Sequence, residues 1–220
     1  MNPVTRPSLG AAFAAFPVIG ILRGLAPAVT AAAGQAAAEA GLAALEVTLN
    51  RPDALAQIGA LRQALGEAVL VGAGTVLDAE QARQALAAGA QFLVSPVVDA
   101  GVMAVGQAAG VALFPGALTP TEVLGAWRAG ATMVKVFPAN PLGPAYLKAL
   151  KAPLRDIALL PTGGVGLHNL EAFLDAGAAG AGVGEPLFDP ERLRAGDWPW
   201  LRERVRLFRA VFEARRAAAS

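Results

Sequence analysis

Short runs of apolar residues alternate with alanine-rich helical segments along this chain, with a repeat of roughly 20–25 residues. Five of the helical segments end in alanine followed by glycine, at Ala40-Gly41, Ala88-Gly89, Ala109-Gly110, Ala129-Gly130 and Ala176-Gly177. Glycine suits this position because the residue just past a helix end often adopts a left-handed conformation. The apolar runs are predicted β-strands and span residues 17–23, 44–49, 69–75, 92–96, 111–115, 133–138, 158–162 and 179–184.

The predicted strands are apolar almost throughout, which is typical of parallel strands that are covered on both faces. Eight such strands alternating with helices most simply close into an α/β fold of the (β/α)8 TIM-barrel type, although an open doubly wound sheet can also hold eight units. A helix at residues 8–16 is expected to cap the bottom of the barrel, and one at 200–216 to lie outside it. We expect residues 1–220 to form a single domain.

Polar side chains gather on one predicted face of these strands. In a barrel of this kind alternate residues point inward, and the active site lies at the carboxyl ends of the strands. We assign residues 19, 21 and 23 to the inner face of the first strand, and residues 71, 73 and 75 to that of the third. The same alternation on the other strands brings five polar residues to one mouth of the barrel: Arg23, Glu46, Thr75, Lys135 and Thr162.

Lys135 is the strongest candidate for a catalytic residue. The chain has three lysines and fifteen arginines, and Lys135 alone among the lysines interrupts an apolar strand, Met-Val-Lys-Val-Phe. Burial lowers the pKa of a lysine, and the uncharged amine can attack a carbonyl to form a Schiff base. The competing interpretation is a structural Lys–Glu pair inside the barrel, but a buried ion pair is a weak stabilising device. We therefore favour catalysis.

The other polar residues suggest roles around that amine. Glu46 is placed to transfer protons during Schiff-base chemistry through a water molecule, and its competing role is that of a counter-ion to Lys135 or Arg23. Arg23 and Thr75 could hold a substrate carboxylate, the arginine through a bidentate fork, while the competing role for Arg23 is a salt bridge at the rim. Gly163-Gly164, after the seventh strand and before a helix, resembles a backbone cradle for phosphate, which Gly182 and Gly184 would complete.

Composition narrows the possible partners. The net charge of +1 gives no strong field for nucleic acid or an anionic membrane, so we expect a small-molecule substrate. The chain has no cysteine and one histidine, His168, so disulfides, thiolate nucleophiles and histidine metal clusters are excluded. We expect no metal and no cofactor. The apolar stretch at 11–22 is too short to span a bilayer and contains Pro17, which favours a cytoplasmic protein over a secreted one.

Several motifs occur in order along the chain. They are Glu-Val-Thr-Leu at 46–49, Gly-Ala-Gly-Thr-Val at 72–76, Ser-Pro at 95–96, Phe-Pro-Gly at 114–116, Lys-Val-Phe-Pro at 135–138 and Pro-Thr-Gly-Gly-Val at 161–165. In this combination they resemble the 2-keto-3-deoxy-6-phosphogluconate/phosphogalactonate aldolases, a group that also includes 4-hydroxy-2-oxoglutarate aldolases. The resemblance runs from about residue 17 to residue 188.

The resemblance implies a metal-independent class I aldolase, usually a homotrimer, that cleaves a 2-keto-3-deoxy-6-phospho sugar acid into pyruvate and glyceraldehyde 3-phosphate. By motif, Lys135 would be the Schiff-base lysine and Glu46 the acid/base. Thr75 would bind the pyruvyl carboxylate, and Thr162 would lie beside the substrate hydroxyls. The remaining matches are Pro96 and Phe137, which would pack around the pyruvyl group, and Gly163, Gly164 and Gly184, which would bind phosphate.

Two positions depart from the family pattern. Asn50 follows Glu-Val-Thr-Leu where phosphogluconate aldolases often carry arginine, and Arg51 comes one residue later, so either Arg23 or Arg51 would bind the anion. Glu185 stands where serine is common, and a carboxylate beside a phosphate repels it unless it points away. The competing functions are 4-hydroxy-2-oxoglutarate cleavage, a barrel isomerase or a thiazole-synthase-like enzyme, and a non-catalytic barrel that binds a small molecule.

Overall fold

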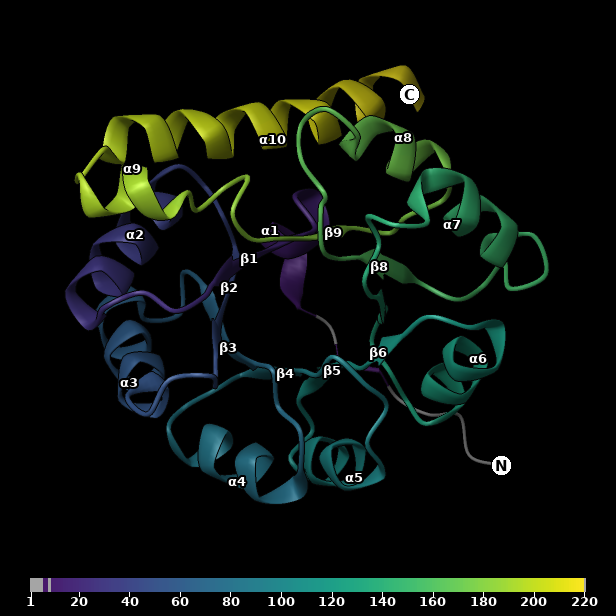
Figure 1. The fold of residues 1–220 in the computed structure, drawn as a ribbon, viewed down its shortest axis with the longest axis horizontal. Coiled ribbons are helices and arrows are strands. Elements are labelled where there is room, and N and C mark those ends of the chain that lie inside the picture. Colours follow the sequence, from purple (N-terminus) through teal and green to yellow (C-terminus); the bar gives the residue numbers. More distant parts are fainter. Residues whose placement is uncertain (1–5, 8, 220) are drawn as a thin grey trace.

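The computed structural model, which describes residues 6–7 and 9–219, is an α/β fold with a curled parallel sheet inside a layer of helices (Figure 1). The strands are β1 (Val18–Leu22), β2 (Ala44–Thr48), β3 (Leu70–Gly74), β4 (Phe92–Val94), β5 (Ala112–Phe114), β6 (Gly116–Ala117), β7 (Val134–Val136), β8 (Leu159–Pro161) and β9 (Ala181–Val183). The helices are α1 (Gly10–Ala15), α2 (Pro27–Glu39), α3 (Ala54–Leu65), α4 (Ala79–Ala87), α5 (Ala100–Ala108), α6 (Pro120–Arg128), α7 (Gly143–Lys151), α8 (Leu170–Asp175), α9 (Pro190–Arg194) and α10 (Trp198–Ala219).

The strands pair in parallel in two groups. Six follow the order β5-β4-β3-β2-β1-β9, and three follow the order β6-β7-β8. Each predicted apolar run contains a strand, but the short β6 was not predicted. It is separated from β5 by Pro115 alone, and proline breaks a strand ladder because it has no amide hydrogen to donate. A single parallel bridge, Thr162 to Gly182, connects the end of β8 with β9.

Side-chain caps begin several of the helices that follow strands. Asp78 and Asp99 accept hydrogen bonds from amides in the first turns of α4 and α5, and Thr119 forms a reciprocal capping box with Glu122 in α6. Such caps satisfy amide groups that have no partner within the helix. Each helix therefore begins at a defined residue soon after a strand ends, which keeps the strand ends on one side of the molecule.

The buried residues form two clusters that separate the faces of the strands. The outer cluster contains Leu45 and Val47 of β2 and Val134 and Val136 of β7, which pack toward the helices. The inner cluster contains Ile19, Ala44, Phe92, Phe114 and Leu160, from five different strands. The predicted inner faces of β1, β2, β7 and β8 are confirmed by this division.

The prediction for the third strand is wrong. Val71 and Ala73 of β3 belong to the outer cluster, while Leu70 packs against the inner one. The inner face of β3 therefore carries Gly72 and Gly74, because successive side chains point to opposite faces. The alternation could not be read from this strand, since both of its faces carry small or aliphatic residues.

Helix α1 packs beneath the inner cluster. Phe13 is 3% exposed and contacts the same group of inner residues, and Figure 1 shows α1 lying across the middle of the ring of strands. The helix begins at Gly10, later than the predicted start, and Ser8 lies outside the described residues. Phe13 thus packs in the same cluster as Ala43 and Ala44, at the start of β2.

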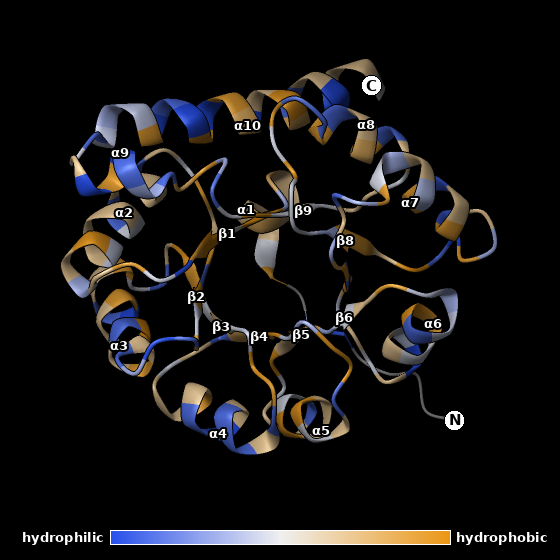
Figure 2. Ribbon diagram, in the orientation of Figure 1, coloured by the Kyte–Doolittle hydropathy of each residue, from blue (hydrophilic) through white to orange (hydrophobic). Residues whose placement is uncertain are grey.

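Helix α10 extends from Trp198 beyond both predicted ends and is banded in blue and orange in Figure 2, because hydrophilic and hydrophobic residues alternate along it. Its apolar side, including Leu201, Val205, Phe208 and Phe212, is buried. Arginines on its flanks bind the rest of the chain: Arg202 pairs with Glu39 of α2, and Arg215 pairs with Asp175 of α8. The basic face therefore helps to attach the helix. Among the described helices, none is both long and apolar enough to cross a bilayer.

Candidate active site

Lys135 lies in the middle of β7 and is only 4% exposed. Its two neighbours, Val134 and Val136, point into the outer apolar cluster, so the lysine side chain points to the interior. The amine nitrogen lies 4.9 Å from the centre of the Phe137 ring. Within the described part of the chain, no hydrogen bond or close ion pair is formed by this amine. The lysine side chain is therefore buried, and its amine faces the Phe137 ring.

Glu46 lies on β2 and is 2% exposed. Its carboxylate fits into space left by a glycine on the neighbouring strand: a Cβ atom added to Gly74 would lie 2.0 Å from Glu46 Oε1. Glu46 is also in register with Ile21 of β1. Among the described residues, Glu46 forms no hydrogen bond or close ion pair, so its carboxyl group and the Lys135 amine face the interior together.

Burial shifts the pKa of each group in the direction that favours its neutral form. It raises the pKa of the Glu46 carboxyl, and the positive charges of Lys135 and Arg23 offset this only in part. It lowers the pKa of the Lys135 amine, opposed by attraction to Glu46 and reinforced by repulsion from Arg23. A neutral amine is a nucleophile, and a carboxyl group whose pKa is raised can take up and return a proton in acid–base catalysis.

The contact between Gly74 and Glu46 leads to a prediction. Gly74→Ala is expected to push the carboxylate out of its position, lower kcat at least tenfold and destabilise the fold by about 1–3 kcal/mol, as overpacking does. Gly125→Ala is the matched control, because a Cβ there meets nothing within 4 Å and the residue lies inside α6. Steady-state kinetics and chemical denaturation measure both effects. Unchanged kcat in Gly74→Ala would show that the exact position of Glu46 is unimportant.

A cavity of about 570 Å³ opens at the carboxyl ends of β1, β7, β8 and β9. It is lined by six of the predicted site residues, namely Arg23, Phe137, Thr162, Gly163, Gly164 and Gly184, and by Ile21, Glu185, Pro186, Phe188, Asp189, Pro190, Trp200 and Arg204. Lys135 lies two residues before Phe137 on the same face of its strand, and Glu46 lies beside Ile21, so both are next to the cavity wall. The size is typical of small-molecule sites.

Two consecutive glycines form one wall of this cavity. Gly163 and Gly164 have φ angles of +89° and +77°, which only glycine adopts readily. The Gly164 amide donates no hydrogen bond to another described residue. Gly184, at the end of β9, adjoins the two glycines because the ends of β8 and β9 are bridged through Thr162 and Gly182. Backbone amide groups in a glycine turn of this kind can bind an anion.

The remaining predicted residues lie away from the lining of this cavity. Thr75, at the end of β3, has a φ of +58°, which is rare for a β-branched residue and costs of the order of 1–3 kcal/mol. Strain of this kind is concentrated at functional sites. Pro96 follows β4, and its carbonyl carbon and oxygen approach Gly116 closely. Arg51 is bonded through two nitrogens to Asp53, so of the two candidate arginines only Arg23 lines the cavity.

Sequence reasoning did not find the contribution of α10 to this cavity. Trp200 and Arg204 lie at its wall although they come from the final helix, far along the chain. In the sequence Arg204 is one of several arginines on an amphipathic helix. Nothing in that local pattern distinguishes it from the solvent-facing arginines beside it.

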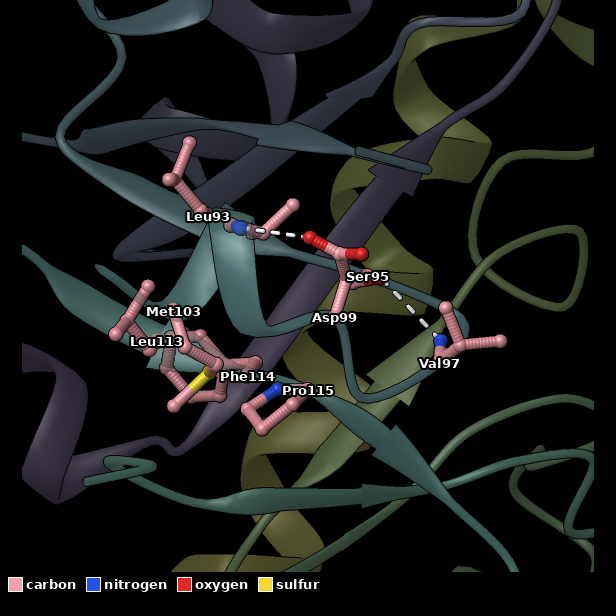
Figure 3. Close-up of a pocket in the computed structure, with 9 residues that line it drawn as sticks. Leu93, Ser95, Val97, Asp99, Met103, Leu113, Phe114 and Pro115 are labelled. Atoms are coloured by element: carbon pink, nitrogen blue, oxygen red, sulfur yellow. Dashed lines mark hydrogen bonds between the residues drawn. The ribbon is translucent and has the colours of Figure 1, made fainter. Parts of the chain in front are cut away.

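A second crevice lies between β4, β5 and α5 (Figure 3). Its wall is largely apolar, with Leu93, Met103 and Leu113 among its residues, and it has no space for a water-sized molecule. The polar groups there are already bonded: Asp99 accepts from the Val102 amide, and Ser95 Oγ accepts from the Val97 amide. This crevice is therefore a gap in packing between a helix and two strands.

A parallel α/β fold whose strand ends surround a buried lysine and a buried carboxylate is typical of lyases that act through a lysine amine. Within the described part of the chain, no group of three or more potential metal-binding side chains lies together. The family model described as "KDPG and KHG aldolase" matches residues 14–203. The chain belongs to this family of aldolases, and the resemblance seen in its motifs is confirmed.

Similar proteins agree with this assignment. A 2-dehydro-3-deoxy-6-phosphogalactonate aldolase of Escherichia coli (strain K12) is 42% identical over 173 residues, which cover 78% of this chain and 84% of that protein. A solved structure described as native KDPGal has a TM-score of 0.84 at 37% identity, covering 90% of this chain and 95% of that one. A KDPG aldolase from Legionella pneumophila, with pyruvate captured at low pH as a covalent carbinolamine intermediate, has a TM-score of 0.83 at 30% identity, covering 93% and 98%.

Proposed function

We propose that this protein is a class I aldolase that cleaves a 2-keto-3-deoxy-6-phospho sugar acid into pyruvate and glyceraldehyde 3-phosphate. The observation that carries the proposal is the buried amine of Lys135, whose pKa is lowered by burial, facing the same interior as Glu46. The phosphogalactonate and phosphogluconate relatives support the substrate class. The captured carbinolamine of the Legionella enzyme supports a covalent route.

In the proposed reaction the neutral Lys135 amine attacks the C2 carbonyl of the substrate and forms a carbinolamine. Loss of water gives an iminium ion, which accepts the electron pair of the C3–C4 bond when that bond breaks. Glu46 takes the proton of the C4 hydroxyl, directly or through water, as the aldehyde leaves. The resulting enamine is protonated at C3, and hydrolysis of the iminium ion releases pyruvate and restores the amine.

The other residues are assigned to binding. Arg23 is exposed at the cavity, and we propose that it holds the carboxylate of the substrate. Thr75 is proposed to bind the same carboxylate, with the strained backbone of that residue as support for a functional role. Pro96 and Phe137 would pack around the pyruvyl group, and Thr162 would lie beside the substrate hydroxyls. The glycine backbone at Gly163 and Gly164, with Gly184, would bind the phosphate.

We further infer that the two strand groups close into one (β/α)8 barrel and that α1 is its N-terminal cap. Only Pro115 separates β5 from β6, so these two strands can count as one strand that pairs on both sides. The bridge between Thr162 and Gly182 supports closure at the other junction. The packing of Phe13 against the inner cluster supports the cap, and we regard the chain as one domain.

We also infer a homotrimer, as the family resemblance implies. Leu77, Val97 and Val98 are large apolar residues that are 48%, 50% and 38% exposed. They lie in two neighbouring loops, because the helices that follow approach closely at Ala79 and Gly101. An exposed apolar patch of this kind favours contact with another protein chain.

Because a phosphorylated acid is charged and crosses membranes poorly, we infer that the enzyme works in the cytoplasm.

The function is tested with the wild-type protein. Pyruvate release is expected from at least one C4 epimer of the 2-keto-3-deoxy-6-phospho acid, and borohydride added with pyruvate should trap an adduct on Lys135, located by peptide mass spectrometry. The trapping rate should rise with pH through a midpoint below 10.5, the usual pKa of lysine, because burial favours the neutral amine. Faster cleavage of 4-hydroxy-2-oxoglutarate would reassign the substrate within the family. Absence of both cleavage and adduct would refute the aldolase proposal.

A further inference from the structure

The cavity carries an arginine that the family motifs do not assign. Arg204 projects from α10 to the cavity wall, and together with Arg23 it is one of two cationic side chains in that wall. Arg23 comes from the end of β1, whereas Arg204 reaches the cavity over the loop that follows β9. The two arginines therefore serve different parts of the wall.

The guanidinium group of Arg204 is held in a defined orientation. Its Nε and Nη2 atoms both donate to the carbonyl oxygen of Pro186, each at 3.2 Å. Its central carbon lies 5.7 Å from the centre of the Trp200 ring and 6.0 Å from that of Phe208. Within the described chain it forms no ion pair with a carboxylate, so its charge is not neutralised by a direct partner. An oriented guanidinium with free N–H groups is suited to binding phosphate.

This arginine lies on the side of the cavity where the glycine amides are. Pro186, to which it is bonded, comes two residues after Gly184. A Cβ atom added to Gly166 would lie 3.5 Å from the Cβ of Pro186, so the loop that carries Gly163 and Gly164 packs against the loop after β9. The guanidinium group and the glycine turn are thereby brought to one region of the wall.

The same region contains two carboxylates, so a cation is needed there to offset their repulsion of a phosphate. Asp189 accepts hydrogen bonds from the amides of Glu191 and Arg192 at the start of α9, so its charge is already stabilised. Glu185 is exposed and forms no hydrogen bond or close ion pair among the described residues. A phosphate dianion on the glycine amides would be repelled by Glu185 unless a nearby positive charge offsets it.

We propose that Arg204 binds the phosphate of the substrate and sets the preference of the enzyme for phosphorylated over unphosphorylated acids. This proposal rests on the proposed function, because it names a specificity residue for that reaction. The arginine would contribute charge-assisted hydrogen bonds that the glycine amides cannot supply alone, and it would offset Glu185 without any change to the chemistry at Lys135.

The test compares kcat/KM for 2-keto-3-deoxy-6-phosphogluconate, or its C4 epimer if that is preferred, with kcat/KM for the same acid without phosphate. In Arg204→Gln the ratio of the two values is expected to fall on the order of 10- to 100-fold, as for loss of hydrogen bonds to a charged group. Arg206→Gln is the matched control: it lies on the same helix, is 62% exposed and pairs only with Glu203, and its ratio should stay within about twofold of wild type. Arg204→Lys should give an intermediate ratio.

Equal losses on both acids in Arg204→Gln would mean that the residue only maintains the structure, and no loss on either would mean that phosphate binds elsewhere; both results overturn the proposal. If Arg204→Gln fails to fold, the ratio of the two kcat/KM values is measured in Arg204→Lys instead. An unchanged ratio in that variant would overturn the proposal. Calorimetric titration with inorganic phosphate separates this proposal from the proposed function. Weaker phosphate binding in the variant would support the site even if the wild type cleaved neither acid, and equal binding would refute it.

Discussion

Lys135→Met is expected to abolish aldol cleavage, with kcat/KM reduced at least about 10⁴-fold, because no other side chain near the cavity can form a Schiff base. Borohydride trapping with pyruvate should disappear together with cleavage. Methionine has a similar length and no charge, so it removes the amine while filling the same buried space. Pyruvate release and intact-protein mass spectrometry measure the two effects.

The control for this prediction is Lys148→Met. Lys148 lies near the end of α7 and is exposed, so its replacement should leave cleavage and trapping within about twofold of wild type. Circular dichroism of both variants checks that the fold is intact. Residual cleavage in Lys135→Met above about a hundredth of the wild-type rate would refute the assignment of this lysine as the nucleophile.

Glu46→Gln is expected to lower kcat/KM for cleavage on the order of 10²- to 10⁴-fold, the range typical of lost acid–base catalysis. Pyruvate trapping on Lys135 should continue, although more slowly, because the nucleophile is still present. The pH dependence of trapping should also move to lower pH. The negative charge of Glu46 raises the pKa of Lys135, so its removal lets burial and Arg23 lower that pKa further.

Glu67→Gln is the matched control for this variant, since Glu67 is 87% exposed and lies just before the amino end of β3, opposite the carboxyl ends that carry the site. It should change neither the rate nor the pH dependence. A Glu46→Gln enzyme with wild-type cleavage would show that protons move through water or another group. A trapping profile displaced to higher pH would contradict the electrostatic coupling of Glu46 with Lys135.

Chemistry and substrate binding are assigned to different structural elements of the site. Lys135 and Glu46 are held on central strands, between apolar neighbours and glycine backbone, where their positions are rigid. The cavity wall is built by loops and by α10, which approach from outside the strands. Variants in the wall are therefore expected to change selectivity, whereas variants on the strands change the chemistry.

The inner face of a strand was predictable from the sequence where bulky and polar residues alternate along that strand. In β2 and β7 the large aliphatic residues Val47 and Val136 mark the face toward the helices, so Glu46 and Lys135 had to point inward. The third strand lacks that contrast. Its inner face carries Gly72 and Gly74, and these glycines are explained only by what lies against them, the Phe92 ring and the Glu46 carboxylate.

The parallel α/β order, the buried lysine and its acidic companion were predictable from the sequence, because each follows from local alternation and from the cost of burying a charge. Only the folded chain shows that Arg23 rather than Arg51 lines the cavity, that Thr75 takes a strained conformation, and that Arg204 reaches the cavity from the last helix. These features depend on contacts between segments far apart in the chain or on loop geometry. Periodicity cannot report them, since it records only which face of its own element a residue occupies.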